Sequence, residues 1–136
     1  ATLAKQKRVR QIMRIFQKKI IRQHHRICCD GRDQASLILR KNPRYDAAFY
    51  FKCNLNTTSL RRWLDLKKKV PLEEVKKSLR TRTSLDKKRR HNPLKKMSDA
   101  VLIRTDILNK KAMVTKMSEE IDKKLISKYG RNFKAR

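Results

Sequence analysis

Three clusters of cationic side chains are the residues of this chain best suited to a defined chemistry, the binding of phosphate groups. They are Lys67-Lys68-Lys69, Lys87-Lys88-Arg89-Arg90 and Lys95-Lys96. Ammonium and guanidinium groups displace the counterions that condense on a polyanion, and guanidinium also forms paired hydrogen bonds with phosphate oxygens. Two alternatives are a charged face that meets only solvent and, for the second cluster, a nuclear import signal. We expect phosphate contact rather than a solvated face, because the acids that would balance these cations are missing, and the import signal stays open for the second cluster.

The whole chain shares this imbalance. Its 136 residues contain 39 Lys and Arg but only 12 Asp and Glu, which gives a formal net charge of +27. Such a chain repels itself unless a polyanion neutralises it, so we expect a nucleic-acid partner. The cations expected to contact RNA are Lys7, Arg8, Arg10, Arg14, Lys18, Lys19, Arg22, Arg26, Lys67, Lys68, Lys69, Arg80, Arg82, Lys87, Lys88, Arg89, Arg90, Lys95 and Lys96.

Motifs for catalysis are missing from the sequence. Gly31 and Gly130 are its only glycines and both resemble helix stops, so there is no glycine-rich loop to cradle a nucleotide phosphate. The acids Glu119, Glu120 and Asp122 are typical of a solvated helix face rather than of an acid–base pair. We therefore expect no enzyme, no cofactor and no small-molecule substrate.

His24 and Cys28 could share a metal ion, because they stand four residues apart and would lie on one face of a helix. Only Cys53 and His91 remain as further ligands, and this spacing matches no standard zinc site. We interpret the cysteines as small core residues and the histidines as contacts to phosphate or solvent, with no metal. An odd number of cysteines is a poor disulfide framework and favours a reducing, intracellular setting.

The elements that would position these residues begin with a basic amphipathic helix over residues 3–28. Its apolar residues recur at spacings of three, four and seven, and its other face is almost wholly cationic. Asp30-Gly31 supplies its stop. A second short helix is expected over residues 32–40, closed by Asn42-Pro43. Residues 47–55 contain three aromatic side chains in a row and predict either a short strand or a buried anchor segment.

Further along the chain, hydroxyl side chains at positions 57–59 offer N-caps for a helix that contains Trp63. Pro71 suits the first turn of the next helix, where Glu73 and Glu74 lie near the positive helix end. Residues 76–96 are cationic and predict a linker or extended arm laid along phosphate.

A last helix is expected from Ser98, its N-cap, to Tyr129, with Gly130 as the stop. It is the least basic part of the chain, so we expect it to pack on protein. The side chains expected to contact neighbouring proteins are Phe49, Phe51, Trp63, Ile107, Val114, Met117, Ile121 and Leu125.

These elements predict a mainly α, non-compact chain with a small core, whose helices are joined by basic extended linkers and become ordered within a larger assembly. The expected segments are a basic helix (1–30), short helices with an aromatic anchor (31–75), a basic linker (76–97), a C-terminal amphipathic helix (98–130) and a basic tail (131–136). No apolar run is long enough to span a membrane, so we expect no membrane partner.

In general composition the chain resembles ribosomal proteins and ribosome-assembly factors, a resemblance that rests on no motif. It implies a non-catalytic structural RNA-binding protein of a large ribonucleoprotein, with rRNA-like RNA and neighbouring proteins as partners. The location this implies is intracellular, in the nucleus or nucleolus, with the mitochondrial matrix or the cytoplasmic ribosome as alternatives. The alternative functions are a DNA- or chromatin-binding protein and an interaction module for an acidic protein.

Overall fold

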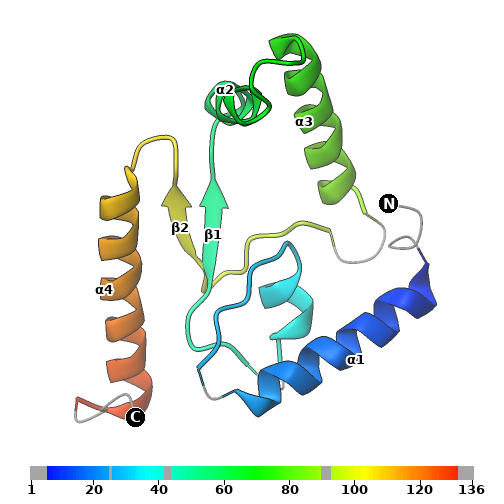
Figure 1. Cartoon of the computed structure of the whole chain (residues 1–136). Helices are drawn as coiled ribbons and strands as arrows, with labels where there is room; N and C mark the ends of the chain where they lie inside the picture. The colour runs from blue at the N-terminus through cyan, green and yellow to red at the C-terminus, as the bar shows by residue number, and fades with distance from the viewer. Residues whose placement is uncertain (1–5, 25, 42–43, 90–92, 132–136) are drawn as a thin grey trace. The chain divides into compact units, whose positions relative to one another are not determined.

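The chain divides into two compact units, Ala1–Tyr45 and Asp46–Arg136, each treated by itself below. The computed structural model describes residues 6–24, 26–41, 44–89 and 93–131. Figure 1 shows the path of the chain through both units.

The first unit pairs helix α1 (Lys7–Gln23) with a short π-helix, η2 (Gln34–Ile38). Arg10 on α1 forms an ion pair with Asp33, with 3.0 Å between Nη2 and Oδ2. The apolar side chains of Ile21 and Ile38 are buried. The unit therefore contains a charged contact between α1 and the residue before η2, and a small apolar core.

α1 is shorter than the expected helix over residues 3–28. It ends at Gln23, because His24 adopts extended backbone angles and its N–H bonds to the carbonyl of Ile21. Gly31 lies beyond this end, before η2, with φ of +156°, so it is not the stop of this helix. The expected second helix over 32–40 is the π-helix, and its expected stop at Asn42-Pro43 lies outside the described residues.

The second unit contains a parallel pair of strands, β1 (Phe49–Lys52) and β2 (Val101–Arg104). Phe49 is paired with Val101 and the register continues to the end of both strands. Aromatic and branched side chains favour extended structure, and Ile103 on β2 is completely buried. Of the two expectations for residues 47–55, the strand is confirmed.

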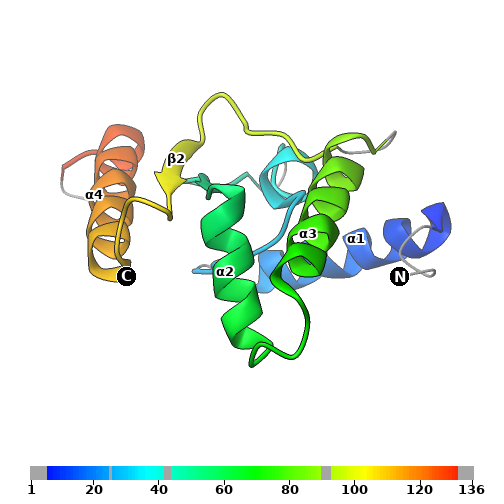
Figure 2. The same cartoon turned by 90° about the horizontal axis from the view of Figure 1, so that it is seen from above.

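Two packed helices connect the strands, α2 (Leu55–Asp65) and α3 (Leu72–Lys87), which lie side by side in Figures 1 and 2. The Asn54 side chain caps α2, in place of the expected hydroxyls at 57–59. Pro71 is the N-cap of α3 rather than a residue of its first turn, and the expected position of both glutamates in that turn is confirmed. α3 extends through Lys87, so residues 76–87 are helical rather than part of an extended arm.

The last helix, α4 (Lys110–Tyr129), begins later than expected because residues 101–104 form β2. Its cap is Asn109, whose Oδ1 accepts the N–H of Ala112 at 2.9 Å, and not Ser98. Gly130 is confirmed as the stop, with φ of +86° and its N–H bonded to Ile126. Asp46 anchors this end of α4 by accepting bonds from Lys128 and Tyr129 at 2.5 and 3.0 Å.

The expectation of a mainly α chain of helices on extended linkers is wrong, because a parallel β1–β2 sheet with a helical crossover makes the second unit α/β. The error arose because Ile103 and Ile107 also fit a helical spacing, and periodicity does not separate a short buried strand from a buried helix segment. In the described part of the chain, no helix is long and apolar enough to cross a membrane.

Candidate phosphate-binding site

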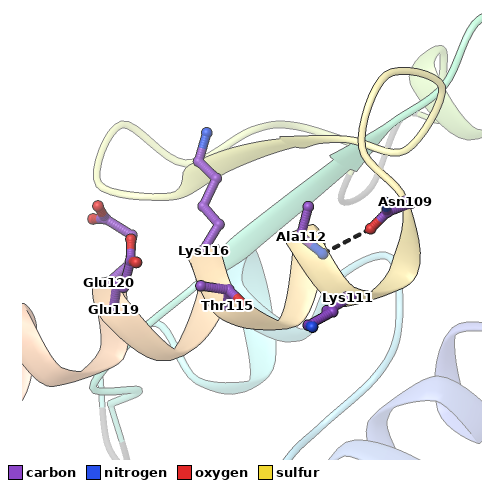
Figure 3. A pocket seen from close by; sticks show the side chains of 7 residues that line it. All are labelled: Asn109, Lys111, Ala112, Thr115, Lys116, Glu119 and Glu120. Carbon is purple, nitrogen blue, oxygen red and sulfur yellow. Dashed lines mark hydrogen bonds between the residues drawn. The ribbon is translucent and has the colours of Figure 1, made fainter.

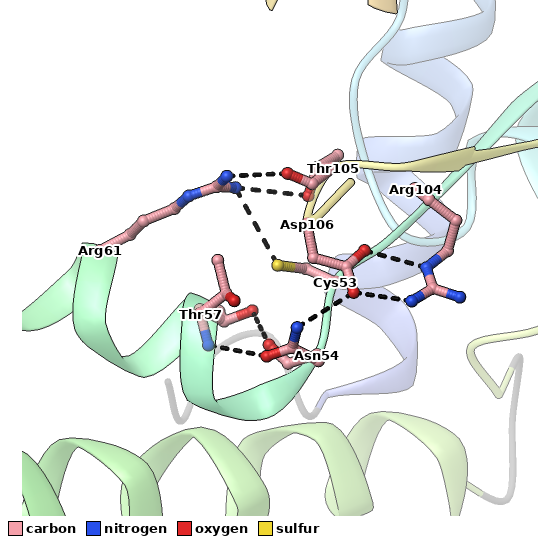
Figure 4. A network of polar contacts seen from close by, with 8 residues as sticks. Cys53, Asn54, Thr57, Arg61, Arg104, Thr105 and Asp106 are labelled. Atoms are coloured by element: carbon pink, nitrogen blue, oxygen red, sulfur yellow. Dashed lines mark hydrogen bonds and ion pairs between the residues drawn. The ribbon is translucent and has the colours of Figure 1, made fainter. Parts of the chain in front are cut away.

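The carboxyl ends of β1 and β2 meet at one edge of the sheet, and polar residues follow both strands there (Figure 4). Cys53 and Asn54 follow β1, and Thr105 and Asp106 follow β2. In open α/β sheets this edge is where ligands bind. This edge of the sheet is therefore the candidate functional site.

Asp106 is the centre of a closed structural network at this edge. Its side chain is only 3% exposed and accepts bonds from Arg104 Nε at 2.9 Å, Arg104 Nη2 at 2.7 Å and Asn54 Nδ2 at 3.1 Å. The bonds from Arg104 hold the pKa of the Asp106 carboxyl well below its usual range, against the opposing effect of burial. Asn54 also accepts the N–H of Thr57 at 2.8 Å. One asparagine thus starts α2 and ties it to the end of β2.

Arg61 on α2 reaches across the same edge (Figure 4), and it forms no ion pair with a carboxylate of the described residues. Its Nη2 donates to the carbonyl oxygen of Thr105 at 2.7 Å, and its Nη1 lies 3.5 Å from Thr105 Oγ1. The guanidinium is exposed and has five N–H groups, so donors remain for a ligand. These bonds fix the orientation of the cation without neutralising it, which suits binding of an anion.

Further arginines without an ion pair lie on the two packed helices α2 and α3, which we call the α2–α3 hairpin. Arg62 follows Arg61, and Arg80 and Arg82 lie on α3; all three are exposed, and none forms an ion pair with a described residue. Arg89 differs, because it pairs with Asp86, which is 4% exposed. The α2–α3 hairpin therefore presents guanidinium groups whose charge the described acids leave free.

The structure separates the cationic clusters that the sequence singles out. The first, Lys67–Lys69, follows α2, and Lys87, Lys88 and Arg89 lie at the far end of α3, about 24 Å away at the rise of an α-helix. Lys95 and Lys96 follow in the irregular segment before β2, and Arg90 lies outside the described residues. The remaining expected RNA contacts, on α1 or just after it, belong to the first unit: Lys7, Arg8, Arg10, Arg14, Lys18, Lys19, Arg22 and Arg26.

The expected protein contacts are spread over the second unit. Phe49 and Phe51 lie on β1, Trp63 on α2, Ile107 before α4, and Val114, Met117, Ile121 and Leu125 on α4. Phe51, Ile107 and Val114 are exposed. Contact of these side chains with another protein stays a prediction.

Sequence reasoning missed Arg61, Arg62 and Asp106. The two arginines do not belong to a longer run of cations. They become candidates for anion binding only because they lie beside a sheet edge, which the sequence pattern did not reveal. The signal that could have identified them was an aromatic strand followed directly by a capped helix with paired arginines, as in a βα unit.

Two other candidate sites carry less chemistry. A shallow hollow along the first half of α4 is lined by Lys111 and Lys116 but also by Glu119 and Glu120, which repel a phosphate (Figure 3). His24 and Cys28 do not share a helix, because α1 ends at Gln23. No cluster of three or more potential metal ligands occurs among the described residues.

The parallel strands, the helical crossover and the cationic helical hairpin place the second unit among α/β proteins suited to bind phosphate groups. Comparison with known proteins gives the family. The profile of the cytidylate kinase family matches residues 1–123, so the chain belongs to that family.

Curated relatives agree with this assignment. The chain is 34% identical to a cytidylate kinase of Alkaliphilus oremlandii over 106 residues, which are 76% of the chain and 47% of that protein. It is 33% identical to a cytidylate kinase of Caldanaerobacter subterraneus over 118 residues, which are 85% of the chain and 51% of that protein. The chain thus spans about half the length of the curated relatives it matches.

The family corrects the functional expectations drawn from composition. A non-catalytic ribosomal or ribosome-assembly protein, a chromatin protein and an acidic-protein module are all wrong, as are RNA as partner and the exclusion of enzymes and small-molecule substrates. The nuclear or nucleolar location is wrong as well, since the relatives are bacterial cytidylate kinases. The glycine argument failed because it required 136 residues to hold every motif of an enzyme, whereas the match covers half of each relative.

Proposed function

We propose that this chain binds nucleotide phosphates as part of a phosphotransferase that acts on cytidylate. The observation that carries the proposal is the family match over residues 1–123, which includes the whole α2–α3 hairpin. Phosphoryl transfer depends on positioning the phosphates and on stabilising the charge that spreads over their oxygens. Oriented guanidinium groups supply both.

The geometry supports a specific division of labour. Arg61 is pre-oriented by the carbonyl of Thr105, so it loses little conformational freedom when it binds an anion. Arg62, Arg80 and Arg82 are exposed on the same hairpin. Arg80 and Arg82 are two residues apart on α3 and lie on different sides of the helix, so at most one of them joins Arg62 at a given phosphate. Their guanidinium groups stay charged at any working pH, so the binding capacity does not titrate away.

Trp63 gives a direct test, because it is the only tryptophan of the chain and follows Arg62 on α2. Its fluorescence should change when ATP, CDP or CMP is titrated in, and cytidine without phosphate should give no comparable change. Arg62→Gln should weaken ATP binding about tenfold, the loss of one charge-assisted contact. Lys110→Gln removes one charge from α4 instead and should leave the affinity within about twofold.

Phosphoryl transfer from ATP to CMP is then measured after the chain is combined with the part of a related cytidylate kinase that lies outside the match. Equal binding of cytidine and its phosphates would contradict the proposal. So would an Arg62→Gln variant that binds ATP as tightly as the unaltered chain.

A further inference from the structure

Two cysteines stand next to each other in the irregular segment that joins α1 to η2 in the first unit (Figure 1). The side chain of Cys28 is exposed, that of Cys29 is half-buried, and both thiols are free. Cys28 is therefore not the small core residue that the sequence predicts. The phosphate chemistry of the α2–α3 hairpin makes no use of this pair, so its chemistry has to be considered by itself.

The local backbone allows the two thiols to act together. Residues 27–30 form neither a helix nor a strand, so the pair is not held in the alternating geometry of a strand, which sends successive side chains to opposite faces. The pKa of the Cys29 thiol is raised by burial and, to a smaller extent, by the neighbouring Cys28. The two sulfur atoms are thus close enough for each to feel the charge of the other.

A direct disulfide between these neighbours would be strained. Consecutive Cα atoms are about 3.8 Å apart across a trans peptide, whereas disulfides usually join Cα atoms about 4.4–6.8 Å apart. A metal ion bound to both sulfur atoms, with bonds of about 2.3 Å, keeps the sulfur atoms farther apart than a disulfide does. This comparison favours an ion between the two sulfur atoms over a bond between them.

The number and type of the ligands select the ion. In the part of the chain that the structure describes, no group of three or more Cys, His, Asp or Glu side chains is placed to hold a metal. Zinc sites use four ligands, and calcium and magnesium prefer oxygen. Thiolates select soft ions such as Cu(I), which two of them satisfy. We propose that Cys28 and Cys29 form a binding site for a soft, two-coordinate cation, represented by Cu(I).

The charges around the pair suit such a complex. Two thiolates and one monovalent cation together carry a net negative charge, and the cation removes the repulsion between the two sulfur atoms. Arg26 lies two residues before Cys28 and is exposed, and the first unit is rich in further cations. Neighbouring cations stabilise thiolates, so this segment favours the charged form that binds the metal.

The test titrates the full, reduced chain with Cu(I) in the absence of oxygen, in competition with bicinchoninate, a chelator whose absorbance reports the Cu(I) that it holds. We expect the chain to withdraw one equivalent of Cu(I) from the chelator. Cys28→Ser and Cys29→Ser should each abolish this withdrawal, because a single thiolate cannot chelate the ion. Zn(II), followed with a zinc-binding dye in the same buffer, should stay with the dye.

Cys53→Ser is the matched control, because it removes the one remaining thiol, which lies in the second unit with its Sγ 4.0 Å from Arg61 Nη1. This variant should withdraw Cu(I) as the unaltered chain does. Circular dichroism checks that each variant keeps its helix content, and Cys29→Ala replaces the half-buried thiol if serine disturbs the packing.

Four results would overturn the proposal: no withdrawal of Cu(I), withdrawal that survives the loss of Cys28 or Cys29, equal retention of Zn(II), or an ion shared between two chains, which sedimentation velocity detects as a Cu(I)-dependent dimer. The inference does not rest on the proposed function. Arg62→Gln, which tests nucleotide binding, should therefore leave the withdrawal of Cu(I) unchanged.

Discussion

Arg61 and Asp106 lie at the same edge of the β1–β2 sheet, but of these two only Asp106 forms an ion pair with a described residue. Asp106 is enclosed by Arg104 and Asn54, so its charge is used within the fold. Arg61 bonds to the uncharged Thr105, so no carboxylate among the described residues neutralises it, and the proposed function assigns its charge to a phosphate. At the scale of single residues, stability and binding are therefore assigned to different side chains and can be tested separately.

The Asp106 carboxyl gives the second unit a stability that acid removes. Its pKa is lower in the folded chain than the unfolded value of about 3.9, so the contribution is complete above that value and is lost as the pH falls toward the folded pKa. Asp106→Asn should destabilise the chain at neutral pH and flatten the loss of stability below about pH 4. Urea midpoints measured between neutral and acid pH check this.

Asp122→Asn is the control for Asp106, because it removes the same charge from an exposed position on α4. This variant should keep the acid sensitivity of the unaltered chain. If Asp106→Asn keeps it too, the network around Asp106 does not govern the acid response.

At the scale of elements, the turn between α2 and α3 stores backbone strain. Lys67 and Lys68 have φ of 52° and 59°, a left-handed conformation that costs a residue with a Cβ about 1–2 kcal/mol. Lys67→Gly should raise the free energy of unfolding by about 0.5–1 kcal/mol, since glycine adopts this conformation freely but loses more entropy on folding. Lys67→Ala removes the same charge and keeps the strain. An equal rise in the free energy of unfolding of this variant would mean that the effect comes from charge alone.

The two asparagine caps form a second matched pair among the elements. Asn54 and Asn109 each accept a backbone N–H three residues on, at 2.8 and 2.9 Å, but only Asn54 also donates to Asp106. Asn109→Ala should cost about 1 kcal/mol and Asn54→Ala about 1 kcal/mol more, in chemical denaturation. Equal costs would show that the bond to Asp106 adds nothing to the cap.

How far the sequence predicts these elements depends on whether their signals are local. The beginning of α3 at Pro71 with Glu73 and Glu74, and the end of α4 at Gly130, follow from residues within one helical turn. The β1–β2 pair does not, because Phe49 and Val101 meet only after a crossover of two helices. The same reason explains why Ser98 was predicted as the cap of α4 instead of Asn109. The sequence pattern does not separate strand β2 from the helix that follows it.

At the scale of the whole molecule, the charge of +27 predicted phosphate binding but not its source. An RNA backbone and a nucleotide offer the same oxygens to Lys and Arg, so composition alone does not separate a ribonucleoprotein from a kinase. The distinction lies in the family match and in a few oriented guanidinium groups, which contribute little to the total charge.

General repulsion and a specific phosphate site can be separated in one thermal experiment. Raising NaCl to about 0.15 M shortens the screening length to about 8 Å and should raise the melting temperature of the whole chain by relieving self-repulsion. Millimolar pyrophosphate at matched ionic strength should raise it further, because a ligand that binds only the folded state stabilises it in proportion to its affinity. Arg62→Gln should lose much of this additional rise while keeping the response to NaCl, and Lys110→Gln should keep both. A rise that depends only on ionic strength would mean that the charge acts as a diffuse field, with no phosphate site on the α2–α3 hairpin.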